Sequence, residues 1–565
     1  MLSIVQQLFC ITFVISLSSA HILQTENGEV NGAILQTRYN EQFLAYFGIP
    51  YGEPPTGDLR FAAPVARAPW NTVLDCTAPG PMCLQANDLG GIPMSEDCLT
   101  LNVFTKNIPS ETNTALKPVI AYVHGGGFYS GVSTQFMPDY LMERDIVVVT
   151  INYRLGAFGF LALETEGATG NQALKDQSLA FKWIQQNIVR FGGDPTMVTA
   201  AGLSAGAHSV TAHMLSPMSQ GLFVNVIAAS GAIAWQKKLK NNNIATAQRT
   251  AQLVNCQNTD VNEMLSCLRQ APAIDIARNM DFPFYNCPIM MWAPVVEPDL
   301  GQERFLTDEP NNLWQAGNFS RVNVLTGVTS EEFISPVPEI LNNPSFRRDF
   351  NENFDEIAPE CFSFEGTEHK TTTEVSQALR KFYLPFETID IRSFNALGNL
   401  FGDGLIGYGV HKFVHYITAH TPVYYYKFSY SGDHSRFNFP RDKPYGVHHV
   451  DDVYYVFRTD FIGPIVQIDE PANVIVQRMT RIYENFAWTG HPHNGSDEFL
   501  IEMNWPRHDN VSEYYLDIGT HMVEKNGLNL ERYTFWDNLE LQSSASALKL
   551  SFFIVACVAA LKNLF

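Results

Sequence analysis

The stretch of this chain best suited to covalent chemistry is Gly202-Leu203-Ser204-Ala205-Gly206. Small and β-branched residues at 197–201 predict a buried strand before it, and residues 205–215 predict a helix after it. A serine at such a junction lies on a tight turn that lifts its hydroxyl to the end of the sheet. The helix N-terminus then faces the oxygen on which negative charge develops. Ser204 is therefore a candidate nucleophile, and the alternative is a glycine-rich turn that holds a serine by chance.

A second glycine cluster, His124-Gly125-Gly126-Gly127-Phe128, directly follows an apolar predicted strand at 119–123. Consecutive glycines let a backbone approach a ligand and point its amides inward. Alone, the cluster could be a flexible turn. Beside a serine turn of this kind, it predicts the second half of an oxyanion hole.

A serine at neutral pH needs a base, and the base needs an acceptor on its other nitrogen. In enzymes with this serine turn the acid and then the histidine follow in the chain. Glu331 and Glu332 come just after a predicted strand at 322–325, and we interpret Glu331 as a solvated surface residue. The stretch 446–452, which contains His448 and His449, lies between a predicted strand at 423–430 and a helix-like segment at 453–457. The remaining histidines of this part have no comparable setting: His411, His415, His420, His434, His491 and His493.

The elements around these residues alternate between strand and helix. Strands are predicted at 99–104, 119–123 and 146–151, a helix at 172–187, and further strands at 197–201, 224–229 and 322–325. This is the order of a doubly wound α/β fold. Residues 29–47 predict a small antiparallel sheet, and residues 241–311 predict helices and loops. Without an internal repeat or a low-complexity linker, residues 21–540 are expected to form one catalytic domain.

The composition excludes some partners. A formal net charge of −21 argues against nucleic acid, because phosphates would be repelled. The cysteines have no metal-ligand spacing and do not cluster with histidines. We expect neither a metal nor a cofactor.

Both ends of the chain carry apolar runs. Residues 1–20 resemble a secretory signal, with an apolar run at 8–17 and small residues before position 21. Residues 541–565 contain small residues, a short spacer and a terminal apolar run, which is the pattern of a glycolipid-anchor signal. A weakly anchoring or packed terminal helix is the alternative. We therefore expect a secreted protein or one on the outer face of the plasma membrane, with three glycosylation sequons, at Asn318, Asn494 and Asn510.

In an oxidising compartment, cysteines close in sequence are the first candidates to pair. Such pairs are Cys83 with Cys98 and Cys256 with Cys267. The cysteines left over in residues 21–540 are Cys76, Cys287 and Cys361, an odd number. At least one of these three should be a buried thiol.

The chain resembles the type-B carboxylesterases, the family of cholinesterases and of insect juvenile hormone and general esterases. The resemblance covers residues 32–536 and rests on the following motifs: Gly48-Ile49-Pro50-Tyr51, Ser95-Glu96-Asp97-Cys98-Leu99, Asn152-Tyr153-Arg154-Leu155-Gly156, Asp176-Gln177 and Phe191-Gly192-Gly193-Asp194-Pro195. It implies an α/β-hydrolase fold, with a large, mostly parallel central sheet and helices on both faces. It also supports the two disulfides. For the site it implies Ser204 as nucleophile, Glu332 as acid, His449 as base, and the amides of Gly126, Gly127 and Ala205 as the oxyanion hole.

Two departures from the family pattern bear on the substrate. The residue before the nucleophile, often Glu or Gln in this family, is Leu203, and no tryptophan lies between Cys83 and Cys98. Both favour uncharged small or lipophilic esters over quaternary ammonium esters. The expected function is carboxylic ester hydrolysis through an acyl-enzyme. One alternative is a hydrolase similar to juvenile hormone esterases, and the other is a non-catalytic adhesion protein of the same family.

Overall fold

The structure is a computed structural model of the chain. It describes residues 21–541 except 87–88, 90, 107, 111–113, 235–238, 279–290, 368, 385, 387, 436–445, 460–463, 494, 496 and 501–502. The proposed signal and all but one residue of the proposed anchor segment therefore lie outside the described residues. Within the described part, no helix is both long and apolar enough to cross a membrane.

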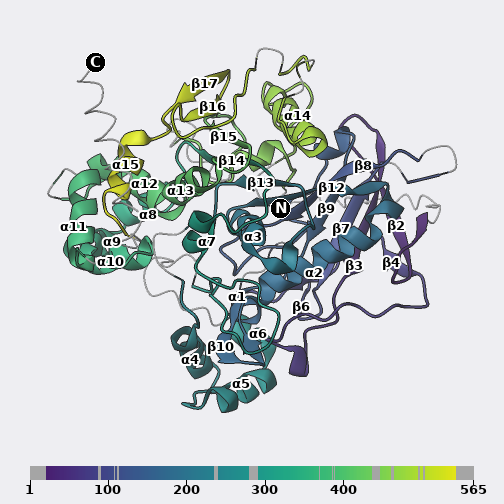
Figure 1. Ribbon diagram of the computed structural model, residues 1–565, viewed down its shortest axis with the longest axis horizontal. Coiled ribbons are helices and arrows are strands. Elements are labelled where there is room, and N and C mark those ends of the chain that lie inside the picture. The colour runs from purple at the N-terminus through teal and green to yellow at the C-terminus, as the bar shows by residue number, and fades with distance from the viewer. Residues whose placement is uncertain are drawn as a thin grey trace, which may run out of the picture.

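One large mixed sheet organises the molecule, in the order β1-β2-β3-β7-β9-β8-β12-β13-β14-β15-β16-β17 (Figure 1). Neighbouring strands from β9 to β16 all run parallel, and antiparallel strands extend the sheet at both edges. The strands of this sheet are β1 (His21–Gln24), β2 (Glu29–Gln36), β3 (Gln42–Pro50), β7 (Thr100–Thr105), β8 (Lys117–Val123), β9 (Val147–Ile151), β12 (Gly193–Leu203), β13 (Asn225–Ala229), β14 (Asn323–Thr329), β15 (Val423–Phe428), β16 (Tyr514–Ile518) and β17 (Met522–Asn526), with β4 (Leu74–Cys76) beside β2.

Successive side chains of the central strands point alternately into two separate apolar cores. In β8, Val119, Ala121 and Val123 belong to the larger core, whereas Ile120 and Tyr122 belong to the smaller one. This alternation follows from the two-residue period of a strand that is covered on both faces. The larger core contains residues of α2 (Gln172–Asn187) and α3 (Ala205–Leu215), and the smaller one contains residues of α14 (Asn473–Thr489). The α/β-hydrolase fold is therefore confirmed.

The other helices form two groups (Figure 1). One group gathers in the middle and C-terminal parts of the chain: α7 (Pro310–Ala316), α8 (Val337–Asn342), α9 (Pro344–Glu352), α10 (Phe354–Cys361), α11 (Thr372–Tyr383), α12 (Phe394–Gly402), α13 (Tyr408–Ile417) and α15 (Leu530–Asp537). A second group lies apart from it: α1 (Gly156–Phe160), α4 (Ile244–Leu253), α5 (Val261–Gln270) and α6 (Ala273–Arg278), with the short hairpin of β10 (Ala162–Thr165) and β11 (Ala168–Thr169). The pair β5 (Met82–Cys83) and β6 (Met94–Ser95) forms a third, two-stranded sheet.

Most predicted elements appear within a few residues of their expected bounds, and the helices at 172–187 and 205–215 match them. The small N-terminal sheet is a correction. Strands β2 and β3 do pair antiparallel, but β3 also pairs with β7, so they belong to the main sheet. Pairing partners so distant in sequence are not encoded in local alternation. The segment at 453–457 is a single 3₁₀ turn over Val453–Tyr455.

Candidate active site

Ser204 occupies the turn between β12 and α3 in a strained backbone conformation. Its φ of 57° and ψ of −121° lie outside the regions that most side-chain-bearing residues adopt. The turn is held by two backbone bonds: the Ser204 amide donates to the carbonyl of Ala229 at 2.9 Å, and the His208 amide donates to the Ser204 carbonyl at 2.9 Å. Ser204 is partly exposed, although its neighbours in the turn are buried. The strain thus presents one hydroxyl at the end of the sheet.

The two glycines of this turn are required by close backbone approach. A Cβ on Gly202 would lie 2.3 Å from the carbonyl oxygen of Gly206, and a Cβ on Gly206 would lie 2.1 Å from that of Val123. The second contact brings the start of α3 against the end of β8. The serine turn and the glycine loop that follows β8 are therefore direct neighbours.

Two residues of the glycine loop have backbone conformations that favour glycine. Gly126 and Gly127 have φ values of 112° and 61°, in the region that favours glycine. The Gly126 carbonyl accepts the amides of Tyr129 and Ser130 at 3.1 and 3.0 Å, which closes the loop on itself. Across from it, Ala205 is the first residue of α3, where backbone amides have no partner inside the helix. The three expected donors thus come from two adjacent backbone segments.

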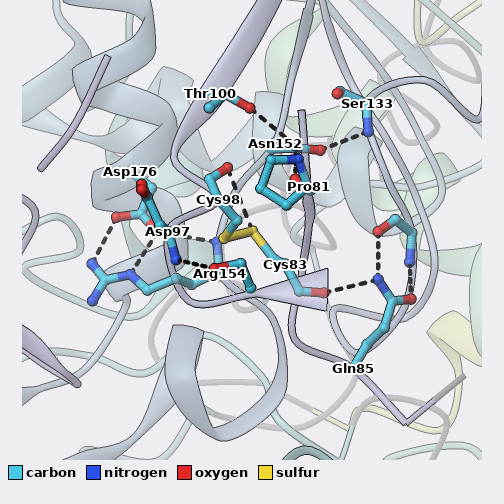
Figure 2. Close-up of a disulfide and its surroundings, with 12 residues drawn as sticks. Pro81, Cys83, Gln85, Asp97, Cys98, Thr100, Ser133, Asn152, Arg154 and Asp176 are labelled. Atoms are coloured by element: carbon cyan, nitrogen blue, oxygen red, sulfur yellow. Dashed lines mark hydrogen bonds and ion pairs between the residues drawn. A yellow bond between two sulfur atoms is a disulfide. The ribbon is translucent and has the colours of Figure 1, made fainter. Parts of the chain in front are cut away.

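Gln85 ties this loop to the neighbouring disulfide (Figure 2). Its carboxamide oxygen accepts the Gly131 amide at 2.9 Å and the Ser130 hydroxyl at 3.0 Å. Its nitrogen donates to the carbonyls of Gly131 at 2.9 Å and Cys83 at 3.1 Å. The side chain is 1% exposed, so these bonds are shielded from water. Sequence reasoning missed Gln85, and its position two residues after a disulfide cysteine is the only local signal.

Glu332 and His449, far apart in sequence, are in hydrogen-bond contact beyond the carboxyl ends of the parallel strands. They follow β14 and β15, which are parallel neighbours, so both lie beyond carboxyl ends of strands. One Glu332 oxygen lies 2.5 Å from Nδ1 of His449, and the other accepts the Thr329 amide at 2.8 Å. The His449 amide also donates to the Glu332 carbonyl at 2.9 Å. Within the described residues, Nε2 of His449 is buried and has no hydrogen-bond partner, which leaves it available for a proton.

Glu331 is not the solvated side chain that we expected from the sequence. It is half-buried, and its carboxylate accepts the Val447 amide at 2.7 Å and the Ser330 hydroxyl. Its own amide donates to the Val447 carbonyl at 3.0 Å. The sequence gives no signal for this contact, because Val447 lies more than 100 residues from Glu331. The expectation was wrong for a physical reason. Burial keeps water away from the Val447 amide, so the Glu331 carboxylate serves as its acceptor.

Other histidines near the site are buried and held neutral. Burial lowers the pKa of His124, His208 and His448 to about 4. His208 lies one helical turn after Ser204, and its Nδ1 lies 2.9 Å from the Ser204 carbonyl oxygen. The ring of Phe333 packs on His449 with centroids 4.5 Å apart. His449, not His448, therefore makes the contact with the Glu332 carboxylate.

The structure contains both expected disulfides, Cys83–Cys98 and Cys256–Cys267. Cys76 is a free, buried thiol, in line with the expectation of at least one such residue, and burial raises its pKa to about 12. Cys361 is also disulfide-bonded. Cys287 lies outside the described residues. Among the described residues, no group of three or more His, Cys, Asp or Glu side chains is placed to hold a metal ion.

Comparisons with known proteins give one consistent result. The model of the carboxylesterase family matches residues 19–536. Esterase E4 of Myzus persicae is 34% identical over 503 residues, covering 86% of this chain and 90% of its own. Juvenile hormone esterase of Tribolium castaneum is 30% identical over 562 residues, covering 94% of each.

A solved structure agrees with these sequence relatives. The crystal structure of juvenile hormone esterase from Manduca sexta, with OTFP covalently attached, matches with a TM-score of 0.81 and 28% identity. The match covers 92% of this chain and 99% of that one. Together with the serine turn and the Glu332–His449 contact on the same sheet edge, these matches decide the classification. The chain belongs to the carboxylesterase family and is a serine carboxylesterase.

Proposed function

We propose that Ser204, His449 and Glu332 form the catalytic triad of this esterase. The observation that carries the proposal is the 2.5 Å contact between Glu332 and Nδ1 of His449. It orients the imidazole so that Nε2 can act as the base. A carboxylate on the far nitrogen also stabilises the imidazolium that forms when the serine gives up its proton.

The proposed reaction has two halves. Ser204 Oγ attacks the ester carbonyl carbon while Nε2 of His449 takes the hydroxyl proton. The carbonyl oxygen becomes an oxyanion, for which the amides of Gly126, Gly127 and Ala205 are the proposed donors. On collapse, the proton passes to the leaving alkoxide, and an alcohol departs from an acyl-enzyme. Water, deprotonated by His449, attacks the acyl carbon and releases the acid with Ser204 restored.

Substitution of the nucleophile tests this assignment. Ser204→Ala should reduce kcat to the residual level of the oxyanion hole and binding alone, a loss of about 10³-fold or more. The folded structure should persist, as an unchanged circular dichroism spectrum would show. In the wild-type protein, an organophosphate should label Ser204 alone, as read by peptide mass spectrometry. Labelling of another residue, or full activity in the alanine variant, would refute the triad.

We propose that the substrates are uncharged small or lipophilic esters. Leu203 places no charge beside the nucleophile, and it is 1% exposed within the smaller apolar core. The relatives named juvenile hormone esterase favour juvenile hormone as one candidate substrate. Release of the juvenile hormone acid from radiolabelled hormone tests that narrower function. Failure there, with other neutral esters cleaved, would leave a general esterase.

We propose that residues 21–540 form one secreted catalytic domain. Asn318 and Asn510 are exposed, as glycan acceptors must be, and Asn494 lies outside the described residues. Residues 541–565 carry the proposed glycolipid-anchor signal. Release of the protein from cells by a phosphatidylinositol-specific phospholipase supports the anchor, and recovery of residues 550–561 in the mature chain excludes it.

A further inference from the structure

The loops after β14 and β15 are joined by paired contacts. The Glu331 amide donates to the Val447 carbonyl, and the His449 amide donates to the Glu332 carbonyl, at 3.0 and 2.9 Å. Glu331 and His448 form an isolated parallel bridge, so the parallel pairing of β14 and β15 resumes beyond the ends of both strands. This extension carries the two triad partners, Glu332 and His449, at matching positions.

One side chain completes this pairing. The Val447 amide, which a continuing strand would satisfy with a carbonyl, donates to the Glu331 carboxylate at 2.7 Å. Val447 is 2% exposed, so water cannot take the place of that acceptor. The Ser330 hydroxyl donates to the same carboxylate oxygen and holds it in place.

The residue before Val447 is shaped to admit this carboxylate. Gly446 has a φ of 103°, and a Cβ at that position would lie 2.3 Å from the Glu331 carboxylate oxygen. Glycine there gives the carboxylate room to reach the Val447 amide. The glutamate carboxylate and the glycine therefore pack directly against each other.

We propose that Glu331 is a positioning residue of the esterase reaction. It holds the Val447 amide and thereby fixes the backbone that sets Nδ1 of His449 against Glu332. The inference rests on the proposed triad, to which Glu331 adds no group that touches the substrate. Misplacing a catalytic side chain by about 1 Å can cost on the order of 100-fold in rate, so the link is expected to act on kcat.

Four variants test the proposal. Glu331→Ala removes the acceptor, and Glu331→Gln keeps an amide oxygen that can accept the same Val447 amide. Glu331→Asp keeps the charge but shortens the reach, and it covers the case in which the alanine variant fails to fold. Glu339→Ala is the matched control, because Glu339 is exposed in the nearby helix α8.

The expected result is a split between kcat and KM on a neutral ester. Glu331→Ala and Glu331→Asp should lower kcat by about 10- to 100-fold with KM within about threefold, whereas Glu331→Gln retains most of kcat. The pH profile of kcat/KM should change in Glu331→Ala and stay as in the wild type in Glu331→Gln, because this profile reports the essential acid and base of the free enzyme. A merely structural role would move neither quantity in the folded enzyme.

Two other outcomes separate this inference from the proposed triad. If Glu331→Ala and Glu331→Asp match Glu339→Ala in kcat, the positioning role is wrong and the triad stands. If Glu331→Gln is as inactive as Glu331→Ala while Glu332→Gln stays active, Glu331 is itself the acid. In that case the proposed triad is wrong by one residue.

Discussion

At the residue scale, Leu203 is an uncharged residue at the position before Ser204, where relatives of this family often have a glutamate. A cationic alcohol group needs an aromatic face or a nearby negative charge to offset its desolvation. Leu203 is buried in an apolar core, and the loop between Cys83 and Cys98 contains no tryptophan. Neither means of recognising a quaternary ammonium is supplied by these two positions.

We therefore expect the enzyme to prefer a neutral ester over a cationic one of the same shape. The matched pair is 3,3-dimethylbutyl acetate and acetylcholine, which differ by a carbon in place of the ammonium nitrogen. The neutral ester should have a kcat/KM higher by about 10- to 100-fold, because one charged contact contributes about 1–3 kcal/mol. An acetylcholine value equal to or above that of the isostere would contradict the substrate class and leave the triad untouched.

At the element scale, two loops of the site are each held by a side chain that follows another strand. The glycine loop after β8 is held by Gln85, and the histidine loop after β15 is held by Glu331. Gly131 makes two hydrogen bonds with the Gln85 carboxamide: its amide donates to the carboxamide oxygen, and its carbonyl accepts from the carboxamide nitrogen. Without that side chain, two buried backbone groups would lose their partners.

Gln85→Leu, close in size to the native side chain, should weaken both stability and turnover. Two buried groups left unsatisfied cost about 1–3 kcal/mol each, so the urea midpoint should fall measurably. A glycine loop that is no longer held should also lower kcat by about 10-fold or more, since each oxyanion donor is worth 10²–10³. Gln220→Leu, at an exposed position, is the control and should change neither value. Wild-type kcat in Gln85→Leu would show that the loop keeps its conformation without the clamp.

These contacts also show which features of the site could not be predicted from the sequence. The serine turn, the triple glycine and helices 172–187 and 205–215 are predictable because their signals are local in composition and period. The proposed roles of Glu331 and Gln85 depend on contacts with Val447 and Gly131, which only the folded sheet brings near. The attachment of β3 to β7 escaped prediction for the same reason: alternation shows that a strand exists but does not identify its neighbour.

At the scale of the whole molecule, buried titratable groups set how stability depends on pH. Burial lowers the pKa of His124, His208, His415 and His448 to about 4 and that of His213 to about 3. An unfolded chain has histidine pKa values of about 6.5 and so binds more protons between these limits. The stability that these neutral histidines contribute is complete above pH 6.5 and is lost as the pH falls toward 4.

The free energy of unfolding should therefore fall between pH 7 and pH 5. Each of these five histidines contributes a loss of about 1–2 kcal/mol. Asp403 and Asp452 act in the opposite sense, because burial raises their pKa to about 6 and the folded chain takes up protons there. Histidine should dominate by number, so the urea midpoint is expected to be lower at pH 5 than at pH 7. A midpoint that is equal or higher at pH 5 would show that the aspartates outweigh the histidines.

The distribution of the site along the sheet has a consequence for synthesis of the protein. The glycine loop and Ser204 follow β8 and β12, but Glu332 and His449 follow β14 and β15, and β16 must still pair beside β15. In the proposed triad, the nucleophile Ser204 is therefore translated more than 200 residues before the base His449. On that proposal, we expect Ser204 to have no esterase activity in the nascent chain, and ester cleavage to begin only after the C-terminal part has folded.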